Sequence, residues 1–307
     1  MRAPGRQRGA VVLVAMLVVA LAATAAGLML QQQDVSIRQL EAARDHEQAR
    51  WLLHGGAQWA RVILRADARA SAIDHGTELW ASGLPPTDIE QGRLSGEIRD
   101  QQGLFNLNNL VRDGKRSERD IANFGRLLRA LGLRAELADA IADWIDADSE
   151  PHSPEGAEDA YYLRLALPYR SANQPMSGIE ELLRVRGCDE AVVNRLRRFA
   201  TALPLRTPVN VNLAPPEVLV ALVDGLTLPE AQILASSRPA VPFLGRDDFR
   251  ARLPSNELNV NNEDISVDSQ FFLVQGRASV GRADLRMQAL LQRSGAALPV
   301  VVWLRMS

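Results

Sequence analysis

The sequence predicts an α+β protein in which a long N-terminal helix packs on an antiparallel sheet and a large all-α insertion interrupts that sheet. Helical periodicity without proline runs from residue 10 to about residue 70. Short helical patterns fill residues 111–262, and strand-like alternation lies on both sides of them. Because strands before and after a helical block can complete one sheet, we expect residues 31–110 and 263–307 to form one domain around the insertion.

The helix begins with an uncharged apolar run at residues 10–30. A helix over this run rises roughly 32 Å, which matches the ~30 Å hydrocarbon core of a bilayer. Three arginines lie within the first eight residues, whereas residues 31–34 carry no positive charge. The positive-inside rule therefore places the N-terminus in the cytoplasm, and we expect a single membrane pass with the rest of the chain on the far side.

A cleaved secretory signal peptide is the alternative interpretation of this run. Ala23, Thr24 and Ala25 have the small side chains of a signal peptidase site. However, the apolar run continues past them to residue 30, and Gly9 stands at the junction between the basic segment and the run. These two details favour a membrane helix that is retained.

Local patterns divide the chain beyond the membrane run. Gly55 and Gly56 lie inside the predicted helix, where each costs about 1 kcal/mol relative to alanine, so they indicate a bend or a close packing contact. Residues 83–92, with two adjacent prolines, end the helical region. Weak alternation at 94–99 and again at 104–107 predicts a β-hairpin, and stronger strand patterns follow within 265–304.

Composition and motifs exclude several function classes. The formal net charge of −2 provides no basic field to attract nucleic acid. Cys188 is the only cysteine, which excludes an intrachain disulfide. The sequence contains no zinc-protease helix motif, no phosphate-binding glycine loop with lysine and no nucleophile elbow. We therefore expect that the protein is not an enzyme.

One loop is unusually acidic and is the candidate metal site. Carboxylates at alternating positions in a proline-interrupted loop can converge on one point, and such hard oxygen ligands suit Ca²⁺. The acidic residues are Asp143, Asp146, Asp148, Glu150, Glu158 and Asp159.

This loop does not have the pattern of an EF-hand. Counted from Asp146, Pro151 takes the position of the required glycine and Ala157 that of the final glutamate. A solvated acidic loop, with Asp146 or Asp148 capping local turns, is the alternative to a calcium site.

Two segments resemble helix-hairpin-helix units, residues 177–188 with the following helix and residues 209–219. In DNA-binding versions, the amides of the hairpin hold a phosphate. Asp189 and Glu190 lie beside the first turn and would repel phosphate, which favours protein packing. A membrane-anchored DNA-binding protein for DNA uptake remains the alternative function.

Taken in order, these segments resemble the K-type minor pseudopilins of the type II secretion system, the general secretion pathway protein K family. The resemblance extends over nearly the whole chain, and its most specific parts are the N-terminal segment and the acidic block together. It implies a pilin-like arrangement of the helix and the sheet. The matching segments are residues 6–23, 100–110, 143–162, 167–187, 209–222 and 271–281.

The resemblance implies that residues 1–9 are a leader that prepilin peptidase removes. This inner-membrane enzyme would cut between Gly9 and Ala10 and methylate the new amine of Ala10. A flexible glycine at the membrane face leaves the backbone accessible where the basic leader ends, which agrees with this role.

Val14 occupies the fifth mature position, where most pilins and pseudopilins carry glutamate. The glutamate can neutralise the N-terminal amine of a neighbour inside the bilayer, where an unpaired charge is costly. A subunit with Val14 lacks this pairing for packing below another subunit but can still be the first one. The residue is therefore consistent with the family's role at the tip of the pseudopilus.

The resemblance also implies the protein's partners and cofactor. The protein would initiate or cap the pseudopilus together with I-type and J-type minor pseudopilins, and aid the export of folded proteins across the outer membrane. Other pseudopilins and the inner-membrane secretion platform would be further partners, with the body of the protein in the periplasm. The resemblance further implies calcium in the helical domain, for which we expect the ligands Asp146, Asp148, Glu158 and Asp159, with Asp143 and Glu150 as alternates.

Overall fold

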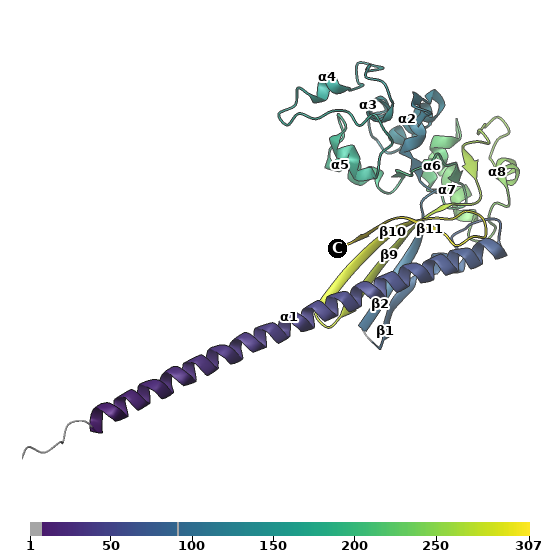
Figure 1. Cartoon of the computed structure of the whole chain (residues 1–307). Helices are drawn as coiled ribbons and strands as arrows, with labels where there is room; N and C mark the ends of the chain where they lie inside the picture. The colour runs from purple at the N-terminus through teal and green to yellow at the C-terminus, as the bar shows by residue number, and fades with distance from the viewer. Residues whose placement is uncertain (1–7, 91) are drawn as a thin grey trace, which may run out of the picture.

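The longest element of the structure is helix α1 (Arg8–Ala70), which extends far beyond the rest of the protein at its N-terminal end (Figure 1). Its 63 residues rise about 94 Å. The structure is a computed structural model that describes residues 8–90 and 92–307. Most of the predicted leader, residues 1–7, therefore lies outside the described residues.

The two halves of α1 have different surroundings. The N-terminal half is long and apolar enough to cross a membrane, and its side chains from residue 10 to residue 29 are exposed. Apolar side chains in such numbers need a lipid or protein cover, so this half fits a membrane anchor. The C-terminal half instead buries one stripe against the sheet, formed by Ala49, Leu53, Ala57, Ala60 and Leu64.

The sheet has five antiparallel strands in the order β1-β2-β9-β10-β11, and α1 packs against it (Figure 1). The strands β2 and β9 are neighbours, although residues 101–270 separate them in the sequence. The predicted α+β fold, with one sheet interrupted by an insertion, is confirmed. The strands are β1 (Leu84–Ile89), β2 (Gly92–Asp100), β9 (Phe271–Val280), β10 (Ala283–Gln292) and β11 (Val300–Met306).

The predicted β-hairpin of residues 94–99 and 104–107 is wrong. Strand β2 pairs instead with β1, so the prolines expected to end the helical region lie in an edge strand, where their missing N–H groups are tolerated. The chain leaves the sheet after β2 because the Asp100 carboxylate accepts hydrogen bonds from the backbone N–H groups of Gln102 and Gly103. The Phe105 N–H then donates to the Phe199 carbonyl, 2.8 Å away.

Residues 101–270, called the helical body below, lie at the C-terminal end of α1 and have their own core (Figure 1). Phe105, Leu107 and Leu110 belong to this core, so the expectation that residues up to 110 lie with the long helix and the first strands is wrong for them. The helices are η2 (Leu107–Leu110), α2 (Glu118–Ala130), α3 (Leu137–Ile145), α4 (Asp159–Tyr162), η3 (Ile179–Arg184), α5 (Glu190–Leu196), α6 (Pro216–Leu222), α7 (Leu228–Ser237) and α8 (Arg246–Ala251), while η1 (Leu79–Ser82) precedes the sheet.

The helical body contains three short strand pairs, and the first and third of these connect segments that are distant in the sequence. These pairs are β3 (Phe105–Asn106) with β6 (Ala200–Thr201), β4 (Val111–Arg112) with β5 (Lys115–Arg116), and β7 (Val209–Asn210) with β8 (Ile265–Ser266).

Of the two predicted helical hairpins, the first forms, with η3 and α5 joined at Gly187 (φ 79°). In the second, a helical pair also forms, with α6 and α7 joined at Gly225 (φ 82°), but it starts only at Pro216, and residues 209 and 210 form β7 instead. Its partner β8 lies more than fifty residues away in the sequence, beyond what a local pattern can indicate.

Replacing Gly55 with alanine is expected to stabilise the protein by about 0.5–1 kcal/mol, because glycine in a helix interior costs that much. The helix continues through Gly55, and a Cβ atom there would have no other atom within 4 Å. The measurement is the thermal unfolding of the full chain in detergent. Gly276→Ala is the contrasting control, since its Cβ would lie 3.1 Å from Leu53 Cδ2, and an equal stabilisation by both would contradict the explanation.

Candidate functional site

The acidic site begins where α3 ends. Ile141, Trp144 and Ile145 anchor this helix in the core of the helical body. Asp146 follows with an extended backbone (φ −67°, ψ 168°), so the chain turns away from the helix axis at this residue. Its side chain stays inside the protein, with 1% of the residue exposed.

Glu158 approaches the same point from the N-terminus of α4. Its Oε2 accepts a hydrogen bond of 2.8 Å from the Ser171 hydroxyl, which fixes the carboxyl group. Only 1% of the residue is exposed. Asp148 completes the group from the exposed loop between α3 and α4.

Asp146, Asp148 and Glu158 each offer one oxygen, and these three atoms lie within 4.8 Å of one another. Both carboxylate oxygens of Asp146 and Oε1 of Glu158 are buried and accept no hydrogen bond from the described residues. Buried acceptors without a donor are costly, and a cation would satisfy them. The residues therefore fit Ca²⁺, which prefers carboxylate and amide oxygens.

The electrostatics of the site agree with this fit. The pKa of Asp146 is raised to about 6, first by burial and then by the charges of Asp148 and Asp143. The pKa of Glu158 is raised to about 7, again first by burial, although the hydrogen bond from Ser171 opposes the rise. The ionised group is thus short of positive charge at neutral pH.

Three other predicted ligands lie outside this group of three oxygens. Asp143 is fully buried, and its Oδ1 pairs with Arg116 Nη1 at 2.5 Å. Asp159 Oδ1 accepts hydrogen bonds from the N–H and the hydroxyl of Ser171. Glu150 is exposed, and its N–H donates to Asp148 Oδ1.

Sequence reasoning missed three residues that shape the site. Arg116 holds Asp143 in place, and Ser171 holds Glu158 and Asp159. Asn173 donates through Nδ2 to the carbonyl of Asp148, and its own Oδ1 is buried without a donor among the described residues. Its positive φ of 46° is uncommon outside glycine. These residues lie 12 to 27 positions from their partners, so no local spacing indicates them.

Replacing Gly156 with alanine is expected to lower stability by about 1–3 kcal/mol, the usual cost of overpacking. A Cβ atom at this position would overlap Asp143 Oδ2 and lie 3.1 Å from the Ser153 carbonyl oxygen. The measurement is the free energy of unfolding of the full chain. Gly245→Ala is the control, because its Cβ would meet no atom within 4 Å; equal losses in the two variants would contradict the steric cause.

The predicted processing residues Gly9 and Ala10 lie in the first turns of α1. Val14, one turn further on, has 60% of its surface exposed, as do its apolar neighbours to a similar extent. The position that carries glutamate in most pilins is therefore an apolar, uncovered surface in this chain.

The helical body matches two family models. Both carry the description type II secretion system (T2SS), protein K, and they cover residues 103–205 and 209–268. Together they span more than half of the chain.

Similar proteins extend the match to nearly the full length. The type II secretion system protein K of Pseudomonas aeruginosa is 34% identical over 299 residues, which cover 94% of this chain and 89% of that protein. The protein of the same name from Pectobacterium carotovorum is 31% identical, with 96% and 95% covered.

A solved structure shows the same fold. The GspK-GspI-GspJ complex from the type 2 secretion system of enterotoxigenic Escherichia coli contains a chain that matches this one with a TM-score of 0.76. The two chains are 26% identical, and the match covers 88% of this chain and 99% of the other. The shared fold therefore includes both the sheet and the helical body.

Proposed function

The chain belongs to the type II secretion system protein K family, and from this premise we propose that it forms the tip of the pseudopilus. As a member of this family it is a minor pseudopilin that takes part in protein secretion. The family models and the similar proteins named above are type II secretion proteins, and they give no support to DNA uptake, the alternative that the helical hairpins suggested. The proposed mechanism is packing into a filament, without catalysis.

The observation that carries the tip proposal is the position of the helical body. It lies at the end of the molecule opposite the apolar half of α1 (Figure 1). In a filament whose subunits pack through parallel N-terminal helices, a subunit added beyond the C-terminal end of α1 would meet the helical body. The helical body would then block the addition of another subunit above it.

The N-terminal half of α1 supports the same position. Val14 supplies no carboxylate to pair with the N-terminal amine of a neighbouring subunit. A chain without this pairing is suited to the first place in the filament. We expect prepilin peptidase to cut between Gly9 and Ala10, and the remaining helix to stay in the inner membrane with the body in the periplasm.

The partners we propose are I-type and J-type minor pseudopilins, because the similar chain from Escherichia coli was solved in a complex with GspI and GspJ. Other pseudopilins and the inner-membrane platform would follow as the filament grows. The protein would thereby start or cap the pseudopilus that helps folded proteins cross the outer membrane.

We also propose that Asp146, Asp148 and Glu158 hold a calcium ion, with Asn173 as a further oxygen donor and Asp159 held nearby. The ion would neutralise carboxylates that burial leaves without donors. It would also join the loop after α3 to the start of α4, which sequence-distant contacts with Ser171 and Asn173 already connect.

Three measurements on the native full chain test the proposed function. Mass spectrometry of protein from membranes should find a mature N-terminus at N-methylated Ala10, whereas a start near Ala26 or Gly27 would indicate a cleaved signal peptide instead.

Gold-labelled antibody against the helical body should mark one end of each pseudopilus, and labels along its length would contradict a tip position. Copurification with I-type and J-type partners tests the complex.

A further inference from the structure

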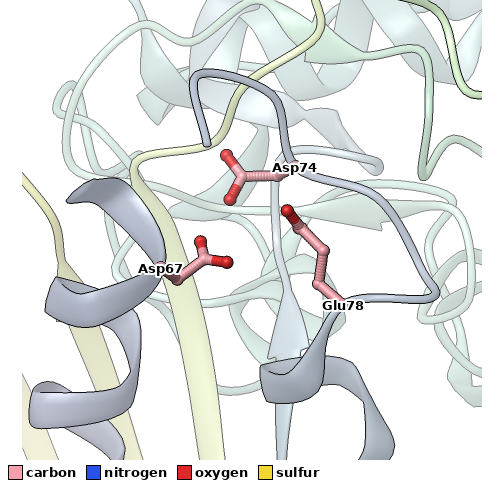
Figure 2. A group of neighbouring side chains, drawn as sticks. All are labelled: Asp67, Asp74 and Glu78. Atoms are coloured by element: carbon pink, nitrogen blue, oxygen red, sulfur yellow. The ribbon is translucent and has the colours of Figure 1, made fainter. Parts of the chain in front are cut away.

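A second group of carboxylates lies far from the acidic loop, at the place where α1 ends. Asp67 lies in the last turn of α1, and Asp74 and Glu78 follow in the segment before η1. Figure 2 shows that the three carboxyl groups point toward one another. One oxygen from each lies within 4.8 Å of the others. Because Ca²⁺ binds oxygens at about 2.3–2.6 Å, two of its ligands can be up to about 5 Å apart, so this spacing suits one shared ion.

In each carboxyl group, one oxygen already accepts hydrogen bonds. Asp67 Oδ2 pairs with Arg293 at 2.8 Å, and Asp74 Oδ2 pairs with Arg293 and accepts from the Ser269 N–H at 2.6 Å. Glu78 Oε2 accepts from the His75 N–H and from Trp80 Nε1.

The second oxygen of Asp74 is the informative one. Only 1% of Asp74 is exposed, and its Oδ1 is buried without a hydrogen-bond donor among the described residues. In Figure 2 this carboxyl group faces the other two. A buried oxygen that accepts nothing, directed at two further carboxylates, is the arrangement that a bound cation would satisfy.

The charges of the group are also unbalanced. Asp67, Asp74 and Glu78 carry three negative charges when ionised, and Arg293 supplies a single positive charge. His75 Nε2 lies 3.9 Å from Glu78 Oε1 and adds a positive charge only when it is protonated. Asp100, which is half-buried nearby, has its own donors in the N–H groups of Gln102 and Gly103. The remaining deficit of two charges equals the charge of one divalent cation. Burial acts first in raising the pKa of Asp74 to about 6, which is consistent with this deficit.

We propose that Asp67, Asp74 and Glu78 form a second cation site, which takes one Ca²⁺ ion and clamps the end of α1 to the helical body. Asp74 is central to this connection. Its N–H donates to the Val267 carbonyl at 2.8 Å, and its own carbonyl accepts from Asn210 Nδ2 at 3.1 Å. Arg293, directly after β10, connects the same group to the sheet. The ion therefore fixes how the helical body sits on the sheet, independently of any ion at Asp146.

The first experiment counts calcium ions on the full chain in detergent by titration calorimetry. Glu78→Gln and Asp67→Asn should each bind one ion fewer than the wild type, while Glu257→Gln, an exposed carboxylate outside both groups, should bind as many. Asp146→Asn removes the site in the acidic loop but should leave the ion at Asp67, Asp74 and Glu78, where α1 meets the helical body (the junction site). Unchanged counts in Glu78→Gln and Asp67→Asn would overturn the proposal and favour a proton shared between Asp67 and Asp74.

The second experiment identifies the site by luminescence of Tb³⁺, which replaces Ca²⁺. Trp80 Nε1 lies 2.8 Å from Glu78 Oε2, so excitation of this indole should sensitise Tb³⁺ at the junction. In the Asp146→Asn Glu158→Gln background, we expect emission that Ca²⁺ suppresses and that a further Glu78→Gln change abolishes. Absence of both emission and Ca²⁺ binding in this background would overturn the site at Asp67, Asp74 and Glu78, and only that site. Emission and Ca²⁺ binding in this background would support it and would not count against the site at Asp146.

Discussion

Replacing Arg116 with alanine is expected to lower the free energy of unfolding of the helical body by about 3–5 kcal/mol, because the change leaves a buried carboxylate without its charge partner. Asp143 is fully buried and pairs with Arg116 Nη1 at 2.5 Å, while Nη2 pairs with Asp139 Oδ1 at the same distance. Burial already raises the pKa of Asp143, and Arg116 opposes that rise. The measurement is denaturant unfolding of the full chain.

Two further variants separate this ion pair from general effects of losing an arginine. Arg112→Ala, at an exposed position on the neighbouring strand β4, should change stability by less than about 0.5 kcal/mol. Adding Asp143→Asn to Arg116→Ala should recover part of the loss, since no buried charge is then left unpaired. A loss in Arg116→Ala no greater than in Arg112→Ala would show that the pair contributes nothing.

Removing calcium at pH 7.5 is expected to lower the melting temperature of the protein strongly. A ligand at a free concentration a thousand times its Kd stabilises the folded state by about 4 kcal/mol. The physical reason is that both carboxylate oxygens of Asp146 and Oε1 of Glu158 are buried without a donor, so that burial opposes their ionisation. The measurement compares thermal unfolding in chelator with that in excess Ca²⁺.

The effect should depend on pH in a defined direction. The folded-state pKa values of Asp146 and Glu158, about 6 and about 7, lie above the values of 3.8 and 4.5 of free groups. Without metal, the stability that these groups contribute is complete below about pH 4 and is lost as pH rises through 6 to 7. Calcium binds the ionised form. The difference between calcium and chelator should therefore be small at pH 5 and largest above pH 7.

Asp146→Asn gives the sharpest test of this explanation, because the sign of its effect should reverse. In chelator at pH 7.5 the variant should be more stable than the wild type, since it lacks a buried unpaired charge. In excess Ca²⁺ it should be less stable, since it has lost a ligand. Glu150→Gln is the matched control on the exposed part of the loop and should follow the wild type in both conditions. The same sign for Asp146→Asn in both conditions would contradict a calcium site.

The sheet and the long helix were predictable because their signals are local. The apolar stripe from Ala49 to Leu64 repeats every three or four residues, and β9 and β10 each alternate between more and less buried positions over seven or more residues. The strands that the sequence did not indicate correctly, β3 and β7, have only two residues each. Their true partners, β6 and β8, come from far along the chain, and long-range pairing decided both cases.

The sequence by itself determined the membrane-length helix, the interrupted sheet, the acidic block and the family, since each depends on patterns along the chain. The tertiary structure alone decided which carboxylates meet. It separates Asp143, paired with Arg116, from Asp146 and Glu158, which have buried oxygens without a donor. It also brings Asp67, Asp74 and Glu78 to one point beside Arg293, a group with no motif in the sequence. The physical reason is that burial and charge pairing arise from packing between distant segments, and these two properties set the chemistry of a carboxylate.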